Sequence, residues 1–353
     1  MPFEIVTVVG ARPQFVKSVA LSRVLAENAD LSERILHTGQ HYDREMSDIF
    51  FDELGIPAPA WKFDVGGGRH GQMTGRMIER IEEVLIEHKP HLVLVYGDTN
   101  STLAGALAAV KLRIPVAHVE AGLRSFNFYQ PEELNRVLTD RVSEILYPPT
   151  ESAAELLRKE NVPGKIEVVG DLMYDSTLLA MELNERRGSS VLDRLGLEKD
   201  RYALVTLHRA ENVDDPARFR TVVDYIVGHT PGMKRLLPIH PRTRARARDF
   251  GIPLDQFVIV DPVGYLDSIE LLSGAAMLFS DSGGMQKEAY FCGTRCVTMR
   301  DETEWGETIE GGWNRLWTEP EFRPQQNITA FGDGAAGKVI ADSLERFLTA
   351  RYA

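Results

Sequence analysis

Cysteine is almost absent from this chain: Cys292 and Cys296 are the only two in 353 residues. Two thiols cannot form a disulfide framework, and no spacing of Cys and His residues is typical of a zinc site. A chain with so few thiols fits a reducing cytosol, where both would pack as small apolar side chains. We therefore expect a cytoplasmic protein whose site contains no metal.

Long apolar runs and an excess of basic residues are also lacking. No apolar run approaches the roughly 20 residues that span a bilayer, and no charged leader precedes the strand-like start of the chain. The net charge is −12, whereas a protein that binds nucleic acid needs a basic surface for the phosphates. We expect neither a membrane nor a nucleic-acid partner. A small anionic ligand stays possible, because it needs only a few cations that converge locally.

Short β-branched runs alternate with amphipathic helical patterns along most of the chain. This alternation predicts parallel sheets covered by helices on both faces, and the length favours two domains. We predict an α/β protein with two doubly wound, Rossmann-like domains facing each other across a cleft. Residues 1–170 would form the first domain and residues 171–335 the second. The expected strands are 5–9, 34–37, 92–96, 116–119, 145–147, 166–169, 202–206, 235–238, 257–260, 276–280 and 296–298. The expected helices between them are 14–27, 44–54, 71–88, 101–112, 132–142, 152–159, 176–187, 217–227, 243–250, 265–274 and 285–292.

A Ser/Gly turn follows the strand at 276–280, and a helix resumes after it. In Asp281-Ser282-Gly283-Gly284 the glycines would let an anion approach the free N–H groups of a helix start. Glu288, further along the helix, would accept hydrogen bonds from sugar hydroxyls. The alternative is that Ser282 only caps the helix and the glycines only make a tight turn.

The first strand ends in Gly10-Ala11-Arg12-Pro13, which also begins a helix. Arg12 and Lys17 would both face an anion at that helix start, or they are ordinary surface cations. The segment is neither a Walker loop nor the G-x-G-x-x-G dinucleotide fingerprint.

Three carboxylates stand at successive strand-to-helix loops of the first predicted sheet. Asp98 follows an apolar strand, Glu120 ends the next one beside a possible partner in Arg124, and Glu132 opens a helix. Taken singly, Asp98 would cap a helix and Glu132 would only complement a helix dipole. Together, like charges in one cleft separate their pKa values and supply an acid and a base.

Positive side chains follow the strands of the second predicted sheet. His208 and Arg209 come after its first strand, and His240 and Arg242 after its second. In a chain of net charge −12 this grouping at the edge that carries the Ser/Gly turn favours a ligand such as a diphosphate. Either histidine alone is more simply explained as a core residue.

In order and spacing, these segments resemble the non-hydrolysing UDP-N-acetylglucosamine 2-epimerase family. The resemblance covers nearly the whole chain, through the segments 10–17, 97–99, 118–124, 131–136, 208–212, 281–288 and 332–334. It implies a glycosyltransferase-B-like fold, a homodimer, and a C-terminal helix, residues 336–353, that packs back on the first domain.

The resemblance also implies inversion at C2 of a UDP-linked N-acetylhexosamine, which feeds surface polysaccharide synthesis. UDP would be eliminated to leave a 2-acetamidoglycal and would then add back, a route that needs no cofactor. The residues that match catalytic positions are Asp98, Glu120, Glu132 and His208. Those expected to bind UDP or the sugar are Arg12, Lys17, Arg136, Arg209, His240, Ser282, Gly283, Gly284 and Glu288. Which carboxylate removes the C2 proton stays open.

Two segments depart from the pattern of the bacterial UDP-GlcNAc enzymes. Gln40-His41-Tyr42-Asp43 replaces a Gln-His-Arg segment that helps bind a second, regulatory UDP-GlcNAc, and Trp305 stands where many members have Arg. Both segments look closer to the branch that acts on UDP-2,3-diacetamido-2,3-dideoxy-D-glucuronic acid. The substrate within the UDP-hexosamine class therefore stays open.

Three other functions fit parts of the pattern. A hydrolysing epimerase would release N-acetylmannosamine and UDP, and a glycosyltransferase of the same fold would pass the sugar to an acceptor. A non-catalytic nucleotide-sugar-binding protein would keep the segment 282–288 but would not need Asp98, Glu120 and Glu132, which are all present.

Overall fold

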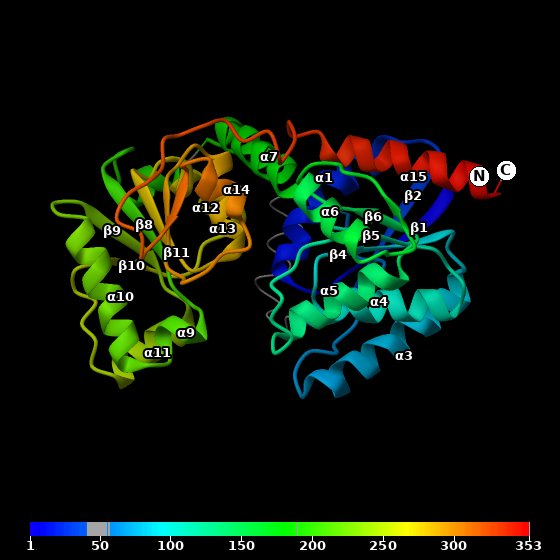
Figure 1. The fold of residues 1–353 in the computed structure, drawn as a ribbon, viewed down its shortest axis with the longest axis horizontal. Helices are drawn as coiled ribbons and strands as arrows, with labels where there is room; N and C mark the ends of the chain where they lie inside the picture. Colours follow the sequence, from blue (N-terminus) through cyan, green and yellow to red (C-terminus); the bar gives the residue numbers. More distant parts are fainter. Residues whose placement is uncertain (41–54, 56, 189, 353) are drawn as a thin grey trace. The chain divides into compact units, whose positions relative to one another are not determined.

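The computed structural model describes residues 1–40, 55, 57–188 and 190–352. The chain divides into two compact units, one made of Met1–Ser176 with Thr329–Ala353 and the other of Thr177–Ile328. Each unit is built on one sheet whose described strands all run parallel (Figure 1). The predicted class, α/β with two doubly wound sheets, is confirmed.

The first unit holds a sheet with the strand order β3-β2-β1-β4-β5-β6-β7. Its strands are β1 Phe3–Val9, β2 Leu31–His37, β3 Trp61–Lys62, β4 Leu92–Tyr96, β5 Val116–Val119, β6 Ile145–Tyr147 and β7 Lys165–Ile166. Its helices are α1 Arg12–Glu27, α3 His70–His88, α4 Asn100–Lys111, α5 Pro131–Val142, α6 Glu151–Lys159, the start of α7 Leu172–Arg186, and α15 Ala336–Tyr352.

Helices cover both faces of this sheet because its central strands are apolar on both sides. All five residues of β4 are buried. Helices α3 and α4 pack side by side on one face, with α5 beside α4, while α1 and α15 pack together on the other (Figure 1). The order of connections reverses between β1 and β4, and at such a switch point the loops diverge and leave room for a ligand.

The second unit holds a sheet with the order β10-β9-β8-β11-β12-β13. Its strands are β8 Tyr202–Thr206, β9 Lys234–Pro238, β10 Val258–Val260, β11 Met277–Ser280, β12 Cys296–Thr298 and β13 Asn314–Leu316. Its helices are the end of α7, then α8 Val191–Leu195, α9 Ala210–Val213, α10 Pro216–His229, α11 Pro241–Asp249, α12 Tyr265–Ser273, α13 Gly283–Phe291 and α14 Gly306–Glu310.

Successive residues of β8 serve two different cores. Tyr202 and Leu204 pack into the core that includes residues of α8, α12 and α13. Ala203 and Val205 pack into the opposite core, which includes residues of α10 and α11. Since side chains alternate across a strand, a fully apolar run of this kind requires helices on both faces.

Several short elements differ from the sequence prediction. The strands β3 and β13 and the helices α8, α9 and α14 were not expected, and β7 ends at Ile166 rather than at residue 169. Helix α7 begins at Leu172, earlier than the expected residue 176. These elements are short, and β13 is in part polar, so their own sequence carries little periodic signal. The helix expected over residues 44–54 lies outside the described residues.

The start of α15 is held by a carboxylate of α7. Asp175 accepts hydrogen bonds from the backbone N–H of Ala336 at 3.2 Å and of Gly337 at 2.7 Å. Two N–H groups that have no intrahelical partner are thereby satisfied. Burial nevertheless raises the pKa of Asp175 to about 6, against the opposing effect of these two backbone hydrogen bonds.

This raised pKa predicts a pH-dependent stability that the Asp175→Asn variant lacks. Because the folded state holds the proton more tightly, the contribution is fully present below the unfolded pKa of 3.8 and is lost as the pH rises through about 6. Between pH 7.5 and pH 5 we expect the wild type to gain about 1–3 kcal/mol relative to Asp175→Asn. Urea denaturation of both proteins across this range measures the difference. A difference that does not change with pH would contradict the prediction.

No helix in the described part of the chain is both long enough and apolar enough to cross a membrane.

Candidate functional site

The loops after β1 and β4 are tied together by the buried side chain of Gln14. Its Oε1 accepts from the N–H of Gly10 at 2.8 Å and of Ala11 at 3.1 Å. Its Nε2 donates to the carbonyl of Tyr96 at 2.9 Å and to the hydroxyl of Thr102 at 3.0 Å. Sequence reasoning did not single out Gln14. The sequence did contain a signal for this role: Gln14 stands three residues after Ala11 at a helix start, where a Gln side chain can bind the N-cap backbone N–H.

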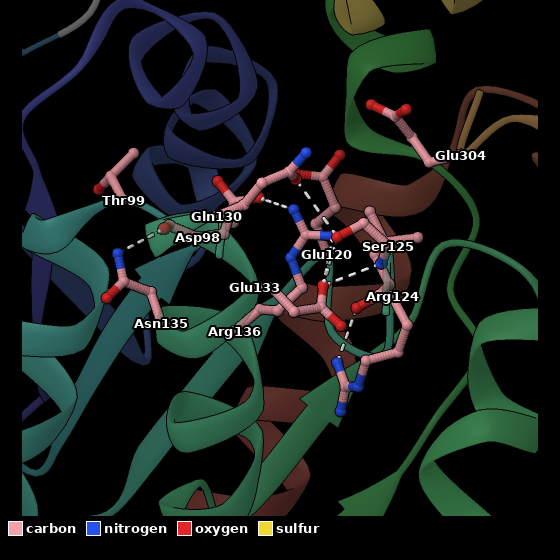
Figure 2. A network of polar contacts seen from close by, with 12 residues as sticks. Asp98, Thr99, Glu120, Arg124, Ser125, Gln130, Glu133, Asn135, Arg136 and Glu304 are labelled. Carbon is pink, nitrogen blue, oxygen red and sulfur yellow. Dashed lines mark hydrogen bonds and ion pairs between the residues drawn. The ribbon is translucent and has the colours of Figure 1, made fainter. Parts of the chain in front are cut away.

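Asp98 lies two residues after the end of β4 and does not cap the following helix. Thr99 is the N-cap of α4, and its hydroxyl accepts from the N–H of Thr102. The Asp98 carboxylate instead accepts from Arg136 Nη2 at 2.5 Å (Figure 2). Burial raises the pKa of Asp98 and nearby Glu120 adds to the rise, while Arg136 and Lys17 oppose it.

Glu120 directly follows β5 and has a positive φ of 64°, a conformation that is uncommon for a residue with a side chain. Its carboxylate forms an ion pair with Lys17, whose side chain comes from α1 and is largely buried. The prediction that Glu120 pairs with Arg124 is wrong, because Arg124 forms ion pairs with Asp140 and Glu160. The Arg124 side chain is almost completely buried within the unit.

A side chain added at Gly97 would come close to this ion pair. A Cβ there would lie 3.2 Å from Glu120 Oε2 and 3.8 Å from Lys17 Nζ. Helix α1 and the loops after β4 and β5 therefore bring Lys17, Asp98 and Glu120 to one edge of the sheet, as parallel strands require. Arg12 opens α1 at the same edge and is half-buried.

Two adjacent glutamates at the start of α5 have different surroundings. Glu132 is exposed in the first turn, where its charge also complements the helix dipole. Glu133 is fully buried and accepts from the N–H of Ser125 at 2.8 Å and of Phe126 at 3.0 Å (Figure 2). Glu133 also lies 3.5 Å from Arg136, so it shares that guanidinium with Asp98. The sequence did not single out Glu133. Glu132 and Glu133 are the same residue type, and only the packing of α5 decides which of the two is buried.

In the second unit, Asp281 joins the loops that follow β8 and β11. Its fully buried carboxylate accepts from the backbone N–H of His208 and Arg209, the latter at 3.0 Å, and from Asn212 Nδ2 at 3.2 Å. Burial acts to raise the pKa of Asp281, but these hydrogen bonds and the His208 ring outweigh it, and the pKa is lowered. Asp281 is therefore an anchor for the loop that carries His208 and Arg209.

His208 and His240 lie near one another at this edge of the second sheet. Their ring centroids are 6.2 Å apart, and His208 Nδ1 lies 3.2 Å from Asp281 Oδ1. His240 Nδ1 accepts from the backbone N–H of Arg242, and burial, His208 and Arg242 lower the pKa of His240. The charge of Arg242 is taken up by an ion pair with Asp214.

The Ser/Gly turn leads directly into α13, as the sequence predicts. Ser282 occupies the N-cap position, but its side chain makes no capping hydrogen bond. Gly283 has the carboxylate of Glu304 beside it, because a Cβ there would lie 2.7 Å from Glu304 Oε1. Gly284 follows in the first turn, and Glu288 is buried further along the helix.

Among the residues that the structure describes, no group of three or more His, Cys, Asp and Glu side chains is arranged to hold a metal ion. The changed segment at 40–43 falls only in part on described residues. Gln40 accepts from the N–H of Ser101 at 3.0 Å and from its hydroxyl at 2.7 Å. Residues 41–43 lie outside the described part.

Comparison with known proteins decides the family. A sequence model described as UDP-N-acetylglucosamine 2-epimerase matches residues 23–345. The chain belongs to the UDP-N-acetylglucosamine 2-epimerase family. Members of this family are isomerases, and this chain is one of them.

Curated relatives of this epimerase match over most of both chains. The UDP-2,3-diacetamido-2,3-dideoxy-D-glucuronate 2-epimerase of Pseudomonas aeruginosa is 52% identical over 89% of this chain and 88% of its own. A UDP-N-acetylglucosamine 2-epimerase homolog of Methanococcus maripaludis is 48% identical over 93% of this chain and 92% of its own.

A solved structure shares the fold across nearly the whole chain. The UDP-GlcNAc 2-epimerase of Methanocaldococcus jannaschii, in complex with UDP-GlcNAc and UDP, superposes with a TM-score of 0.88 at 40% identity. The match covers 98% of this epimerase and 100% of that chain. The glycosyltransferase-B-like fold that the sequence resemblance implied is confirmed.

Proposed function

We propose that this epimerase inverts C2 of a UDP-linked N-acetylhexosamine by eliminating UDP and adding it back, without hydrolysis. The observation that carries the proposal is the pair Asp98 and Glu120, each held against a cation at neighbouring strand ends of one sheet. The curated relatives are named as 2-epimerases, which disfavours the hydrolysing and non-catalytic alternatives.

The chemistry needs a base and an acid beside C1 and C2. In elimination the base takes the C2 proton, the C2–H electrons form the C1–C2 double bond, and UDP leaves with the electrons of the C1–O bond. In re-addition UDP attacks C1, and an acid returns a proton to the opposite face of C2. Burial raises the pKa of Asp98, so Asp98 holds a proton to higher pH than an exposed aspartate. That favours Asp98 as the acid, and Glu120 and Glu132 as candidates for the base and for the group that stabilises positive charge at C1.

The loops of the second unit fit the UDP part of the substrate. The N–H groups at the start of α13 and the glycines Gly283 and Gly284 suit a diphosphate. His208, oriented by Asp281, would assist UDP departure, while Arg209 and His240 add donors at the same edge. Ser282 would bind the diphosphate, and Glu288 the ribose. In the first unit, Arg12, Lys17 and Arg136 would hold the sugar and stabilise the developing charges.

For the substrate, we propose UDP-2,3-diacetamido-2,3-dideoxy-D-glucuronic acid. The support is the 52% identity to the Pseudomonas aeruginosa enzyme named for that sugar. UDP-GlcNAc is the second candidate, because relatives at 43% and 39% identity are named for it. Two free cysteines support a cytoplasmic location, where nucleotide sugars would feed surface polysaccharide synthesis.

Proton NMR of the purified protein with each sugar in D₂O, without added NAD, tests the proposal. Deuterium at C2 together with the epimeric UDP-sugar establishes the reaction, and the faster sugar identifies the substrate. Release of free sugar and UDP would instead establish a hydrolysing enzyme. With neither sugar changed, the proposed function is wrong for both.

We further propose that the protein is a homodimer joined through the outer face of α3, α4 and α5. These neighbouring helices carry exposed apolar side chains: Ile86 is 55% exposed, Val110 37%, Leu134 48% and Leu138 39%. Leu134 and Leu138 lie one turn apart on α5, so a second copy of the same face would cover both.

Leu138→Glu is expected to convert the dimer to a monomer, because the carboxylate would lose its water inside an apolar interface. Light scattering after size exclusion measures the mass. Leu178→Glu, at a similarly exposed position on α7, is the control and should leave the mass unchanged. A monomeric wild type, or a Leu138→Glu variant that stays dimeric, would contradict the proposal.

A further inference from the structure

A fully buried histidine and aspartate lie beneath the loops that carry Asp98 and Glu120. His118 of β5 and Asp140 of α5 both have no exposed surface. His118 Nδ1 lies 2.7 Å from Asp140 Oδ1, and His118 Nε2 lies 2.7 Å from the carbonyl oxygen of Gly97. A carbonyl can only accept, so Nε2 carries a hydrogen and donates to Gly97.

Asp140 faces several donors in addition to the imidazole ring. Its Oδ2 accepts from Arg124 Nη1 at 2.8 Å and from the N–H of Gly122 at 3.2 Å. Arg124 is itself held by Glu160 at 2.7 Å. Nδ1 of His118 therefore faces a carboxylate that Arg124 and the Gly122 N–H also hold in place.

Each end of the His118–Asp140 pair holds one of the two loops. The Gly97 carbonyl directly precedes Asp98, and the Gly122 N–H lies two residues after Glu120. Gly97, Glu120 and Gly122 all have positive φ, at 61°, 64° and 81°. Gly97 and Gly122 adopt a positive φ readily because they have no Cβ, whereas Glu120 keeps one only where the surrounding structure holds it in place. The pair is therefore a common anchor for both loops.

We propose that His118 and Asp140 are positioning residues that set the separation of the Asp98 and Glu120 carboxylates. The inference rests on the proposed function, because it is through Asp98 and Glu120 that the pair would act on the reaction. Neither His118 nor Asp140 touches the substrate, since both are fully enclosed. A misplacement of about 1 Å in such a pair costs about 100-fold in rate, so turnover depends on this anchor.

Two substitutions at His118 separate its two hydrogen bonds. In His118→Gln the amide nitrogen reaches the place of Nε2 and keeps the donor to Gly97, whereas in His118→Asn it reaches the place of Nδ1 and keeps the donor to Asp140. We expect each variant to lower kcat by about 10- to 100-fold. KM and the affinity for UDP should change less than about threefold, because the proposed UDP ligands belong to the second unit.

A matched control accounts for the loss of a buried hydrogen bond alone. Ser343→Ala removes the buried contact of 3.0 Å between the hydroxyls of Tyr147 and Ser343 in the same unit. The urea midpoint of unfolding should fall, as for any orphaned buried polar group, while kcat stays at the wild-type value. Asp140→Asn is the second test variant, used if the His118 variants fail to fold.

The outcomes distinguish the inference from the proposed function. An active wild type with reduced kcat and unchanged KM in the His118 or Asp140 variants supports the inference. Wild-type kcat in a folded variant would overturn it, as would a loss of kcat that Ser343→Ala reproduces at equal stability. An inactive wild type on both sugars would count against the proposed function instead.

Discussion

Glu120→Gln and Asp98→Asn are each expected to lower kcat by about 100-fold or more while UDP binds with unchanged affinity. Both substitutions keep the size of the side chain and remove its ability to exchange a proton. Lys17 and Arg136 would retain a neutral oxygen as partner, so the loops should keep their places. The rate of C2 deuteration measured by NMR gives kcat, and calorimetry gives the affinity for UDP.

An exposed glutamate of the same unit provides the control for this prediction. Glu79→Gln on α3 changes the net charge by the same amount and should leave kcat unchanged. Glu132→Gln tests the third carboxylate. Glu132 is exposed in the structure, and its proposed catalytic role rests on its sequence position alone. If Glu120→Gln or Asp98→Asn turns over at the wild-type rate, that residue has no part in proton transfer.

Gly122→Ala is expected to destabilise the first unit severely. Gly122 has a φ of 81°, and a Cβ there would lie 2.5 Å from the backbone carbonyl oxygen of Ala153. A backbone oxygen in α6 cannot swing aside as a flexible side chain would. The left-handed conformation costs roughly 1–2 kcal/mol and the overlap roughly 1–3 kcal/mol more, so we expect a loss of about 2–5 kcal/mol. Urea denaturation measures the loss.

Gly67→Ala separates the two contributions to that loss. Gly67 has nearly the same φ, 80°, and no atom lies within 4 Å of the position that a Cβ would occupy. The Gly67→Ala variant should therefore lose only the stability that the left-handed conformation costs, about 1–2 kcal/mol. Equal losses in the two variants would show that the contact with Ala153 does not matter. The overlap would also shift the Gly122 backbone N–H that donates to Asp140, so a folded Gly122→Ala protein should lose turnover as well.

The long apolar strands were predictable from the sequence. Because such strands are buried on both faces, their residues form continuous apolar runs that can be recognised locally. The strand β4 is fully buried, and β8 sends alternate residues into two cores, so both read as apolar runs between helical patterns. The strand β13 contains Asn314 and Arg315 and forms through pairing with β12, which local periodicity does not record. Its place in the sheet is a tertiary property.

Candidate site residues at strand ends were predictable for a related reason. Parallel strands place their carboxyl ends at one edge, so the positions of Asp98, Glu120 and His208 follow from the order of elements. The side-chain partners do not follow from that order. Glu120 pairs with Lys17, which is remote in sequence, rather than with the nearby Arg124, and Glu133 rather than Glu132 is buried. The direction of a side chain depends on turns such as the positive φ of Glu120.

The sequence by itself determined the α/β class, the edge of each sheet where polar loops gather, and the resemblance to the epimerase family. Hydrophobic periodicity and the order of motifs carry that information locally. Only the tertiary structure decided which charges meet: Lys17 with Glu120, Asp98 with Arg136, and His118 with Asp140 beneath both loops. These pairs join residues distant in the chain, and packing rather than local pattern brings their side chains within hydrogen-bonding distance.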